Sequence, residues 1–382
     1  MIKEYKQLNE LAVFGAVHPN AIDDGEKRKA LKAINLIKEK RCSKIKVRTV
    51  TDGSQQRKYV SRDETISLTI SLLALFATFI IDVQEGRKVQ TFDISGAYLH
   101  AEIPKEEKVY MKFEGDFADI ICEVKHEYRK FVTIEIDRRV LNIRVLMAIY
   151  GMIESALRWY DLFSSTLTGM GFDINPYDKC TANKILNGSQ CTVGWCVDDN
   201  KVSHVDDDVI DMLVDEIEAK FGKLARNKGI KHTFLGMDIE ILPDKKIIIS
   251  TPQHIEEVVS DLREEIKGGV AIPAKSKHFY VNTKSCKLSE KKAELFHKLV
   301  AKLLWITQRS RTDLETGVSF LCTRVQESTE EDWTQFVRVI SFLKSTRTDR
   351  RIMRADSLNS LDASYAVHTN MRVHTGGVMT LG

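Results

Sequence analysis

The sequence predicts an α+β fold in which an antiparallel sheet is backed by helices. Residues 105–145 alternate β-prone side chains with charged ones, as in Val132-Thr-Ile-Glu-Ile136, which is typical of antiparallel strands. Residues 154–171 carry apolar side chains at helical spacing instead. Further helical patterns cover residues 289–325 and 330–345, so we expect helical additions after the sheet.

Composition is typical of a folded globular protein, with 382 residues, 43% hydrophobic and 29% charged. The seven cysteines form no Cys-X-X-Cys pair, which favours a reducing intracellular compartment and indicates no zinc module. We expect no signal peptide, because none precedes the first charges at Lys3 and Glu4. The uncharged run of residues 65–81 has only 17 residues, five of them Ser or Thr, and fits a buried core helix better than a membrane span.

The N-terminal region predicts a basic helix followed by an extended segment over residues 26–46. An alternating segment, residues 46–51, then breaks at Asp52-Gly53 as a strand entering a turn would. Between Lys27 and Lys58 stand twelve Lys or Arg and only two acids, while the whole chain has a net charge of +3. This basic segment is suited to binding a polyanionic partner. The alternative interpretation is that its charges only form the solvated face of a helix.

Two clusters of adjacent aspartates lie close together in the segment Trp195-Cys-Val-Asp-Asp-Asn-Lys-Val-Ser-His-Val-Asp-Asp-Asp208. The second cluster precedes apolar residues that recur every fourth position up to Phe221, and Gly222 stands at the expected C-terminal cap. Asp206, Asp207 and Asp208 are therefore interpreted as the N-terminal cap of a helix.

The first pair, Asp198-Asp199, lies between two short apolar strands, where helix capping does not explain it. Two carboxylates at the tip of a strand-turn-strand repel each other unless cations neutralise them. A site for two metal ions needs a third carboxylate, and Asp93, which ends the predicted strand of residues 89–93, is the best candidate. An ordinary polar turn is the alternative. Small residues follow Asp93, and Tyr98 after them can stack under a sugar.

Several segments of this chain resemble, in order, the reverse transcriptase of copia-type LTR retrotransposons. They are Phe92-Asp-Ile-Ser-Gly-Ala-Tyr-Leu-His100, Glu107-Lys-Val-Tyr-Met111, Leu146-Met-Ala-Ile-Tyr-Gly-Met-Ile-Glu-Ser-Ala-Leu-Arg-Trp-Tyr160, Cys196-Val-Asp-Asp199 and Phe234-Leu-Gly-Met-Asp-Ile239. The matching motifs extend from about Lys46 to Asp362, most of the chain.

The resemblance implies a right-hand polymerase with fingers, palm and thumb, and a ferredoxin-like antiparallel palm sheet backed by helices. We expect a basic helical extension over residues 1–40, fingers and palm over 41–265, and a helical thumb and connection over 266–354. Residues 355–382 resemble the truncated start of an RNase H domain, with Asp362 in the place of its first metal ligand. We expect no RNase H activity from so short a segment.

The resemblance also implies site residues. Asp93, Asp198 and Asp199 would be the catalytic and metal-binding carboxylates. The positions implied to contact the incoming nucleotide are Lys46, Arg48, Ala97, Tyr98, Tyr150 and Gly151. The hairpin that grips the primer would consist of Phe234, Leu235, Gly236 and Met237.

The implied activity is RNA-directed DNA synthesis with two Mg²⁺ ions, or Mn²⁺ in their place. The implied partners are an RNA template, a DNA or tRNA primer and dNTPs, with no membrane. The implied location is intracellular: the cytoplasm, virus-like particles or the nucleus. The alternatives are a catalytically inactive retroelement remnant that binds nucleic acid only, and a phosphohydrolase or nuclease.

This chain departs from the family pattern near the chemistry and beyond it. Cys196 stands where the family usually has Tyr before Val-Asp-Asp, at a position that supports the primer terminus. Arg311-Thr-Asp313 replaces an Arg-Pro-Asp run, and Met152-Ile-Glu-Ser-Ala156 lacks a Lys and a Pro of the pattern. These departures indicate a diverged lineage or a decaying genomic copy.

Overall fold

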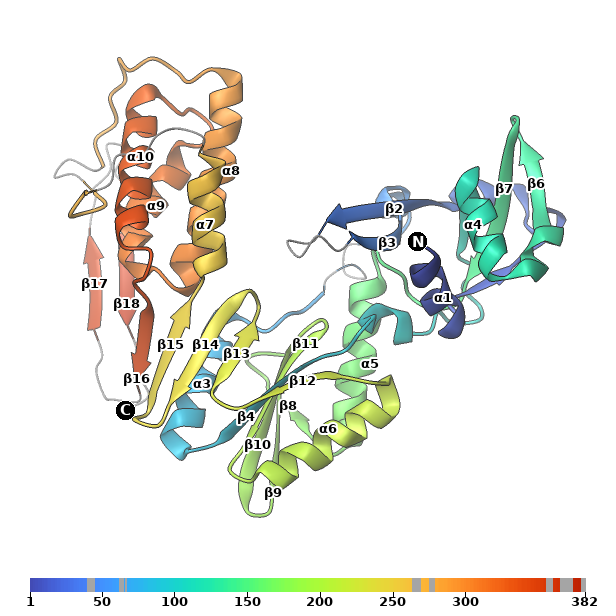
Figure 1. The fold of residues 1–382 in the computed structure, drawn as a ribbon, viewed down its shortest axis with the longest axis horizontal. Coiled ribbons are helices and arrows are strands. Elements are labelled where there is room, and N and C mark those ends of the chain that lie inside the picture. The colour runs from blue at the N-terminus through green and yellow to red at the C-terminus, as the bar shows by residue number, and fades with distance from the viewer. Residues whose placement is uncertain are drawn as a thin grey trace. The chain divides into compact units, whose positions relative to one another are not determined.

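The computed structural model (Figure 1) divides into two compact units, each described separately. The described residues are 1–39, 45–61, 65, 67–262, 269–274 and 279–354, with the backbone of 360–364 and 374–378. The first unit comprises residues 1–71, 92–201 and 211–226, and the second comprises 72–91, 202–210 and 227–382.

A six-stranded sheet in the order β1-β7-β5-β2-β3, with β6 paired to β7, belongs to the first unit. Its strands are β1 (Phe14–Ala16), β2 (Leu31–Glu39), β3 (Ile45–Thr51), β5 (Tyr110–Glu114), β6 (Val132–Glu135) and β7 (Arg138–Val145). The helices α1 (Ile2–Glu10), α2 (Asp24–Lys29) and α4 (Asp116–Val124) accompany them, with the short 3-10 helices η1 (Pro19–Ala21), η2 (Gly53–Lys58) and η5 (His126–Phe131). Apolar side chains from α1, α4, β5 and β7 form one hydrophobic core.

A second six-stranded sheet has the order β12-β4-β11-β10-β9-β8. Its strands are β4 (Lys88–Asp93), β8 (Asp173–Ile174), β9 (Thr181–Leu186), β10 (Ser189–Cys196), β11 (Asp199–His204) and β12 (Ala225–Lys228). The 3-10 helix η4 (Ala97–His100) follows β4. Along the chain, helix α5 (Ser155–Gly169) lies between β4 and the β10–β11 hairpin, and α6 (Asp207–Phe221) connects β11 to β12.

The second unit contains a four-stranded antiparallel sheet and a helical core. The sheet order is β13-β14-β15-β16, from β13 (Lys231–Phe234), β14 (Met237–Leu242), β15 (Lys246–Ser250) and β16 (Arg351–Arg354). The helices are α3 (Leu72–Glu85), α7 (Pro252–Asp261), α8 (Glu290–Arg309), η6 (Thr312–Leu314), α9 (Glu315–Arg324) and α10 (Glu330–Ser345). Helices α7 to α10 bury a shared apolar core (Figure 1). In the described part of the chain, no helix has both the length and the apolar character that a membrane crossing requires.

The structure confirms the predicted strand at residues 89–93, the two short strands on either side of the first aspartate pair, and the helices over 154–171 and 330–345. The cap assignment of the second aspartate cluster is also confirmed, because the N–H of Asp208 donates to Asp206 Oδ1 at 3.0 Å. Gly222 ends α6 with a positive φ of 79°.

The basic helix followed by an extended segment, predicted from residue 26 onward, is confirmed as α2 (Asp24–Lys29) and then β2 (Leu31–Glu39). The expected basic extension over 1–40 is therefore only partly helical. Residues 31–39 form β2 because they find strand partners on both sides, β3 antiparallel and β5 parallel. Helix α4 interrupts the strands expected over 105–145, and the helix expected over 65–81 begins only at Leu72. At the C-terminal end, β17 (Ser360–Ser364) and β18 (His374–Val378) pair antiparallel.

Candidate active site

The first aspartate pair lies at the tip of the β10–β11 hairpin, as predicted. Val197 and Asp198 form the turn, and Asp199 begins β11. Val197 has a φ of 57°, in the left-handed region that a β-branched residue rarely adopts. The turn is held from outside, because Trp159 Nε1 donates to the Val197 carbonyl at 2.8 Å and Asn200 Nδ2 donates to the Asp198 carbonyl at 2.7 Å. The backbone that presents the two carboxylates is therefore fixed by side chains.

Asp93 lies beside this turn, at the end of the neighbouring strand β4. The N–H of Ile94 donates to the carbonyl of Asp198 at 3.0 Å, which joins the two segments. Burial, and then the negative charge of Asp198, raise the pKa of the Asp93 carboxyl, while the cations Lys46 and Arg48 lower it. The structure thus brings together four of the predicted site residues: two carboxylates and two cations.

Two tyrosines and an arginine form the polar-aromatic side of the site. The ring centroids of Tyr98 and Tyr150 are 5.1 Å apart, and the guanidinium carbon of Arg48 lies 5.0 Å from the Tyr150 centroid. Burial raises the pKa of Tyr150 to about 12 and also raises that of Tyr98, to which the charge of Asp198 contributes. Both phenols therefore remain neutral hydrogen-bonding groups at physiological pH.

Gly151 brings the loop after Tyr150 into contact with strand β3. Its φ is 93°, and a Cβ there would lie 2.0 Å from the carbonyl oxygen of Thr51. Beside this contact, the N–H of Thr51 donates a hydrogen bond to the Tyr150 carbonyl at 2.8 Å. Gly53 meets the loop from the other side, since a Cβ there would lie 2.1 Å from the Gly151 carbonyl. Only glycine permits this approach, which fixes Tyr150 against β3.

The carboxylates of this site are the candidate ligands for a divalent cation. Among the residues that the structure describes, no group of three or more His, Cys, Asp or Glu side chains is arranged to hold a metal ion. Asp93 and Asp198 still offer the oxygen ligands that Mg²⁺ prefers. Burial, and after it the charge of Asp198, raises the pKa of Asp93, and a bound cation would favour the charged carboxylate. Asp199, the third predicted carboxylate, is half-buried at the start of β11. The carboxylates therefore fit a cation in their chemistry.

The remaining predicted residues lie in different surroundings. Ala97 is buried in η4, the 3-10 helix that follows β4. In the second unit, Phe234 and Met237 are buried and flank a turn formed by Leu235 and Gly236, with φ of 49° and 73°. A Cβ at Gly236 would meet the rings of His254 and Trp305 at 3.1 and 3.2 Å.

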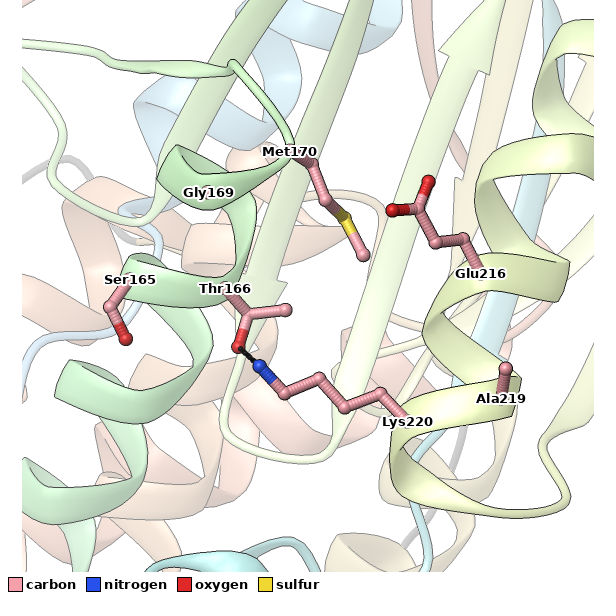
Figure 2. Close-up of a pocket in the computed structure, with 7 residues that line it drawn as sticks. All are labelled: Ser165, Thr166, Gly169, Met170, Glu216, Ala219 and Lys220. Carbon is pink, nitrogen blue, oxygen red and sulfur yellow. Dashed lines mark hydrogen bonds between the residues drawn. The ribbon is translucent and has the colours of Figure 1, made fainter.

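A pocket of about 440 Å³ opens between α5 and α6 (Figure 2). Its lining consists of Ser165, Thr166, Gly169, Met170, Glu216, Ala219 and Lys220. Lys220 Nζ donates to Thr166 Oγ1 at 2.8 Å across it. No predicted site residue lines this pocket.

Sequence reasoning gave no role to Trp159 or Asn200, which hold the turn. Asn200 directly follows the aspartate pair, so its adjacency was a usable signal. Trp159 lies within one of the quoted motifs, but its bond to Val197 joins residues 38 positions apart, which no local pattern reveals.

Comparisons with known proteins agree with the quoted motifs. A family model described as reverse transcriptase (RNA-dependent DNA polymerase) matches residues 22–276. The retrovirus-related Pol polyprotein from transposon TNT 1-94 of Nicotiana tabacum is 22% identical over 313 residues, which cover 80% of this chain and 22% of that protein. The corresponding polyprotein from transposon RE2 of Arabidopsis thaliana is 22% identical over 340 residues, covering 88% of this chain and 22% of that protein.

The chain thus spans about 22% of the length of these curated relatives. A solved structure of a foamy viral protease-reverse transcriptase in complex with double-stranded DNA aligns with a TM-score of 0.47 and 11% identity. That alignment covers 98% of this chain and 53% of the other.

Proposed function

Because this chain belongs to the reverse transcriptase (RNA-dependent DNA polymerase) family of copia-type retrotransposons, we propose that it extends a primer with dNTPs on an RNA template. The observation that carries the proposal is the hydrogen bond from Ile94 to Asp198, which places the end of strand β4, with Asp93, beside the aspartate turn. The charges of Lys46 and Arg48 act on the same carboxyl, because they lower the pKa of Asp93. A polymerase needs both kinds of group. Cationic side chains bind the negatively charged triphosphate, and carboxylates hold the metal ions that offset the charge developing on the reacting phosphate.

In the proposed reaction the primer 3′ hydroxyl attacks the α-phosphate of the dNTP, and pyrophosphate leaves. Lys46 and Arg48 receive the triphosphate, since guanidinium and ammonium groups bind phosphate oxygens. Tyr98 packs under the deoxyribose, and Tyr150 supports the pocket beside Arg48. Divalent cations, Mg²⁺ by preference, held by Asp93, Asp198 and Asp199 would offset the charge that develops on the phosphate oxygens.

We assign the sheet that bears the aspartates as a ferredoxin-like palm. Its central order β12-β4-β11-β10, with α5 and α6 as the two helical connections, supports this assignment. The sheet containing β2 and β3 would be the fingers, and helices α7–α10 the thumb and connection. Residues 355–382 would begin an RNase H-like domain.

Phe234, Leu235, Gly236 and Met237 are proposed to grip the primer end. Their buried flanks and tight turn support this role, because a rigid hairpin presents its backbone in one place. The proposed partners are an RNA template and a DNA or tRNA primer.

Primer extension on an RNA template tests the proposal, comparing the wild type with Asp198→Asn and Asp199→Asn. The matched control is Asp206→Asn, because asparagine caps a helix as well as aspartate does. We expect extension to fall at least 100-fold in the first two variants, on the order of 3 kcal/mol of barrier, and to be unchanged in the control. Template-primer binding is measured in parallel.

Equal extension by the wild type and Asp198→Asn would contradict the assignment. Salt-sensitive binding without any incorporation would instead indicate an inactive remnant that binds nucleic acid only.

A further inference from the structure

Helix α1 lies outside the residues matched by the family model, which begin at residue 22, yet it is part of the first unit's core. Tyr5 and Leu8 are each 1% exposed. The ring of Tyr5 meets Phe113 of β5 edge to face, with the centroids 5.7 Å apart. These contacts fix the helix against the sheet.

From this position α1 is hydrogen-bonded to the β2–β3 pair. Asn35 Nδ2 donates to the hydroxyl of Tyr5 at 3.0 Å, and Asn35 Oδ1 accepts from Thr49 Oγ1 at 2.7 Å. Asn35 and Thr49 are direct cross-strand partners. The N–H of Thr49 in turn donates to Glu4 Oε1 at 3.2 Å. Both Glu4 and Tyr5 therefore hold the two strands through Thr49, which is fully buried.

The bond to Glu4 lies on the outer edge of the sheet, because β3 is the last strand in its order. Two residues further along the strand, the N–H of Thr51 donates to the carbonyl of Tyr150 at 2.8 Å. Backbone N–H groups two residues apart point to the same side of a strand. Along the outer edge of β3, the Glu4 carboxylate and the Tyr150 carbonyl thus accept hydrogen bonds from successive outward-facing N–H groups. Arg48 immediately precedes Thr49, the residue that Glu4 binds.

The same helix lies against the segment after the first carboxylate. A Cβ placed on Gly96 would lie 3.5 Å from Gln7 Nε2. Gly96 has a φ of 72° and stands three residues beyond Asp93. One helix therefore touches both the strand with the two cations and the turn that follows the carboxylate.

We propose that Glu4 is a positioning residue for the nucleotide pocket, holding the edge of β3 so that Arg48 stays over Tyr150. This inference rests on the proposed function, in which Arg48 receives the triphosphate. Glu4 acts through the strand and does not touch the substrate. Its loss should weaken nucleotide binding and leave the chemical step largely intact.

Single-nucleotide incorporation on an RNA template with a DNA primer tests this, with KM for the dNTP and kcat measured separately. We expect Glu4→Ala to raise KM about fivefold, the size expected for one lost hydrogen bond, with kcat within about twofold. Glu4→Gln keeps a side-chain oxygen acceptor and should restore the wild-type KM. Glu10→Ala, which removes an exposed carboxylate from the same helix, should change nothing. Tyr5→Phe, which keeps the ring and loses the acceptor for Asn35, should raise KM as well.

Backbone amide hydrogen exchange over residues 45–51 gives a second measurement that does not require activity. Exchange at Thr49 should be faster in Glu4→Ala but not in Glu4→Gln. Wild-type KM and wild-type exchange in Glu4→Ala would overturn the inference. So would a Glu4→Gln variant that behaves like Glu4→Ala, because charge rather than the hydrogen bond would then be responsible. A wild-type chain that incorporates no nucleotide overturns the proposed function instead, and the catalytic part of this inference with it.

Discussion

The indole nitrogen of Trp159 donates a hydrogen bond of 2.8 Å to the carbonyl oxygen of Val197, the residue before the first of the two adjacent aspartates. Trp159 is buried in α5, where it stacks on Phe163 and meets Phe221 edge to face. Val197 has a backbone conformation that costs on the order of 1–3 kcal/mol for a residue of its kind. The bond from a rigid helix therefore helps to keep a strained turn in the form that presents Asp198.

We expect Trp159→Phe to lower kcat about tenfold, because the turn loses a donor while the aromatic packing is largely kept. Single-turnover primer extension measures the effect. Trp195→Phe is the matched control: Trp195 packs on the same Phe163, and within the described residues its indole nitrogen has no hydrogen-bond partner. An equal loss in both variants would show that packing matters and the hydrogen bond does not.

Gly151→Ala should destabilise the first unit by about 3 kcal/mol or more, because the new Cβ would overlap the carbonyl oxygen of Thr51. Urea unfolding measures this. Gly188→Ala is the control, since Gly188 also has a positive φ, 79°, but nothing lies within 4 Å of its would-be Cβ. The control variant should lower the free energy of unfolding by only about 1–2 kcal/mol, the cost of placing an alanine at a positive φ. Equal losses of unfolding free energy in Gly151→Ala and Gly188→Ala would show that the overlap with the Thr51 carbonyl is not the cause of the destabilisation.

Asp93→Asn should raise the melting temperature by about 1–2 °C at neutral pH without divalent cations. The pKa of Asp93 is raised in the folded state, so the folded protein binds its proton more tightly than the unfolded chain does. The carboxylate therefore destabilises the fold above its unfolded pKa, and the gain from asparagine should disappear as the pH falls below about 4.

Thermal melts between pH 3 and pH 8 measure this gain, with Asp206→Asn as the control. Added Mg²⁺ should stabilise the wild type and reduce the advantage of Asp93→Asn, because only the wild type keeps this ligand. An advantage independent of both pH and Mg²⁺ would argue against charge as its source.

Arg311→Lys should lower the stability of the second unit by about 2–3 kcal/mol. The Arg311 side chain is 1% exposed and donates to both oxygens of Asp313, at 2.9 and 2.7 Å, and to the carbonyl and hydroxyl of Thr346. Lysine cannot reproduce this planar fork. Chemical denaturation compares it with Arg347→Lys, an exposed site on the same unit that should be neutral.

The sequence allowed the prediction of both aspartate clusters because each has a local signature. A pair between two short strands indicates a hairpin tip, and a triplet before a periodic apolar run indicates a helix cap. Asp93 could be assigned to the same site as Asp198 because a site for two metal ions needs a third carboxylate and because the family motifs occur in order. The hydrogen bond from Ile94 to Asp198 places the two residues side by side.

The errors arose where distant partners decide the local structure. Residues 31–39 fall within the expected helical extension over 1–40 and alternate imperfectly, so their strand state depends on pairing with β3 and β5. The hydrogen bonds of Glu4 with Thr49 and of Tyr5 with Asn35 join residues 45 and 30 positions apart, and no spacing within the sequence indicates them. The proposed metal site is a middle case. The sequence indicated which carboxylates could bind a cation, while among the described residues the structure shows no group of three arranged to hold one.

The placement of α1 has a practical consequence for expression. A recombinant fragment trimmed to residues 22–276 would match the family signature but lack Tyr5 and Leu8, leaving apolar surface open beside Phe113. The same cut would remove α8 to α10, against which Ile255 and Val258 of α7 pack. Such a fragment is expected to aggregate during purification. The segment that must be cloned to obtain a folded domain is therefore longer at both ends than the segment that identifies the family.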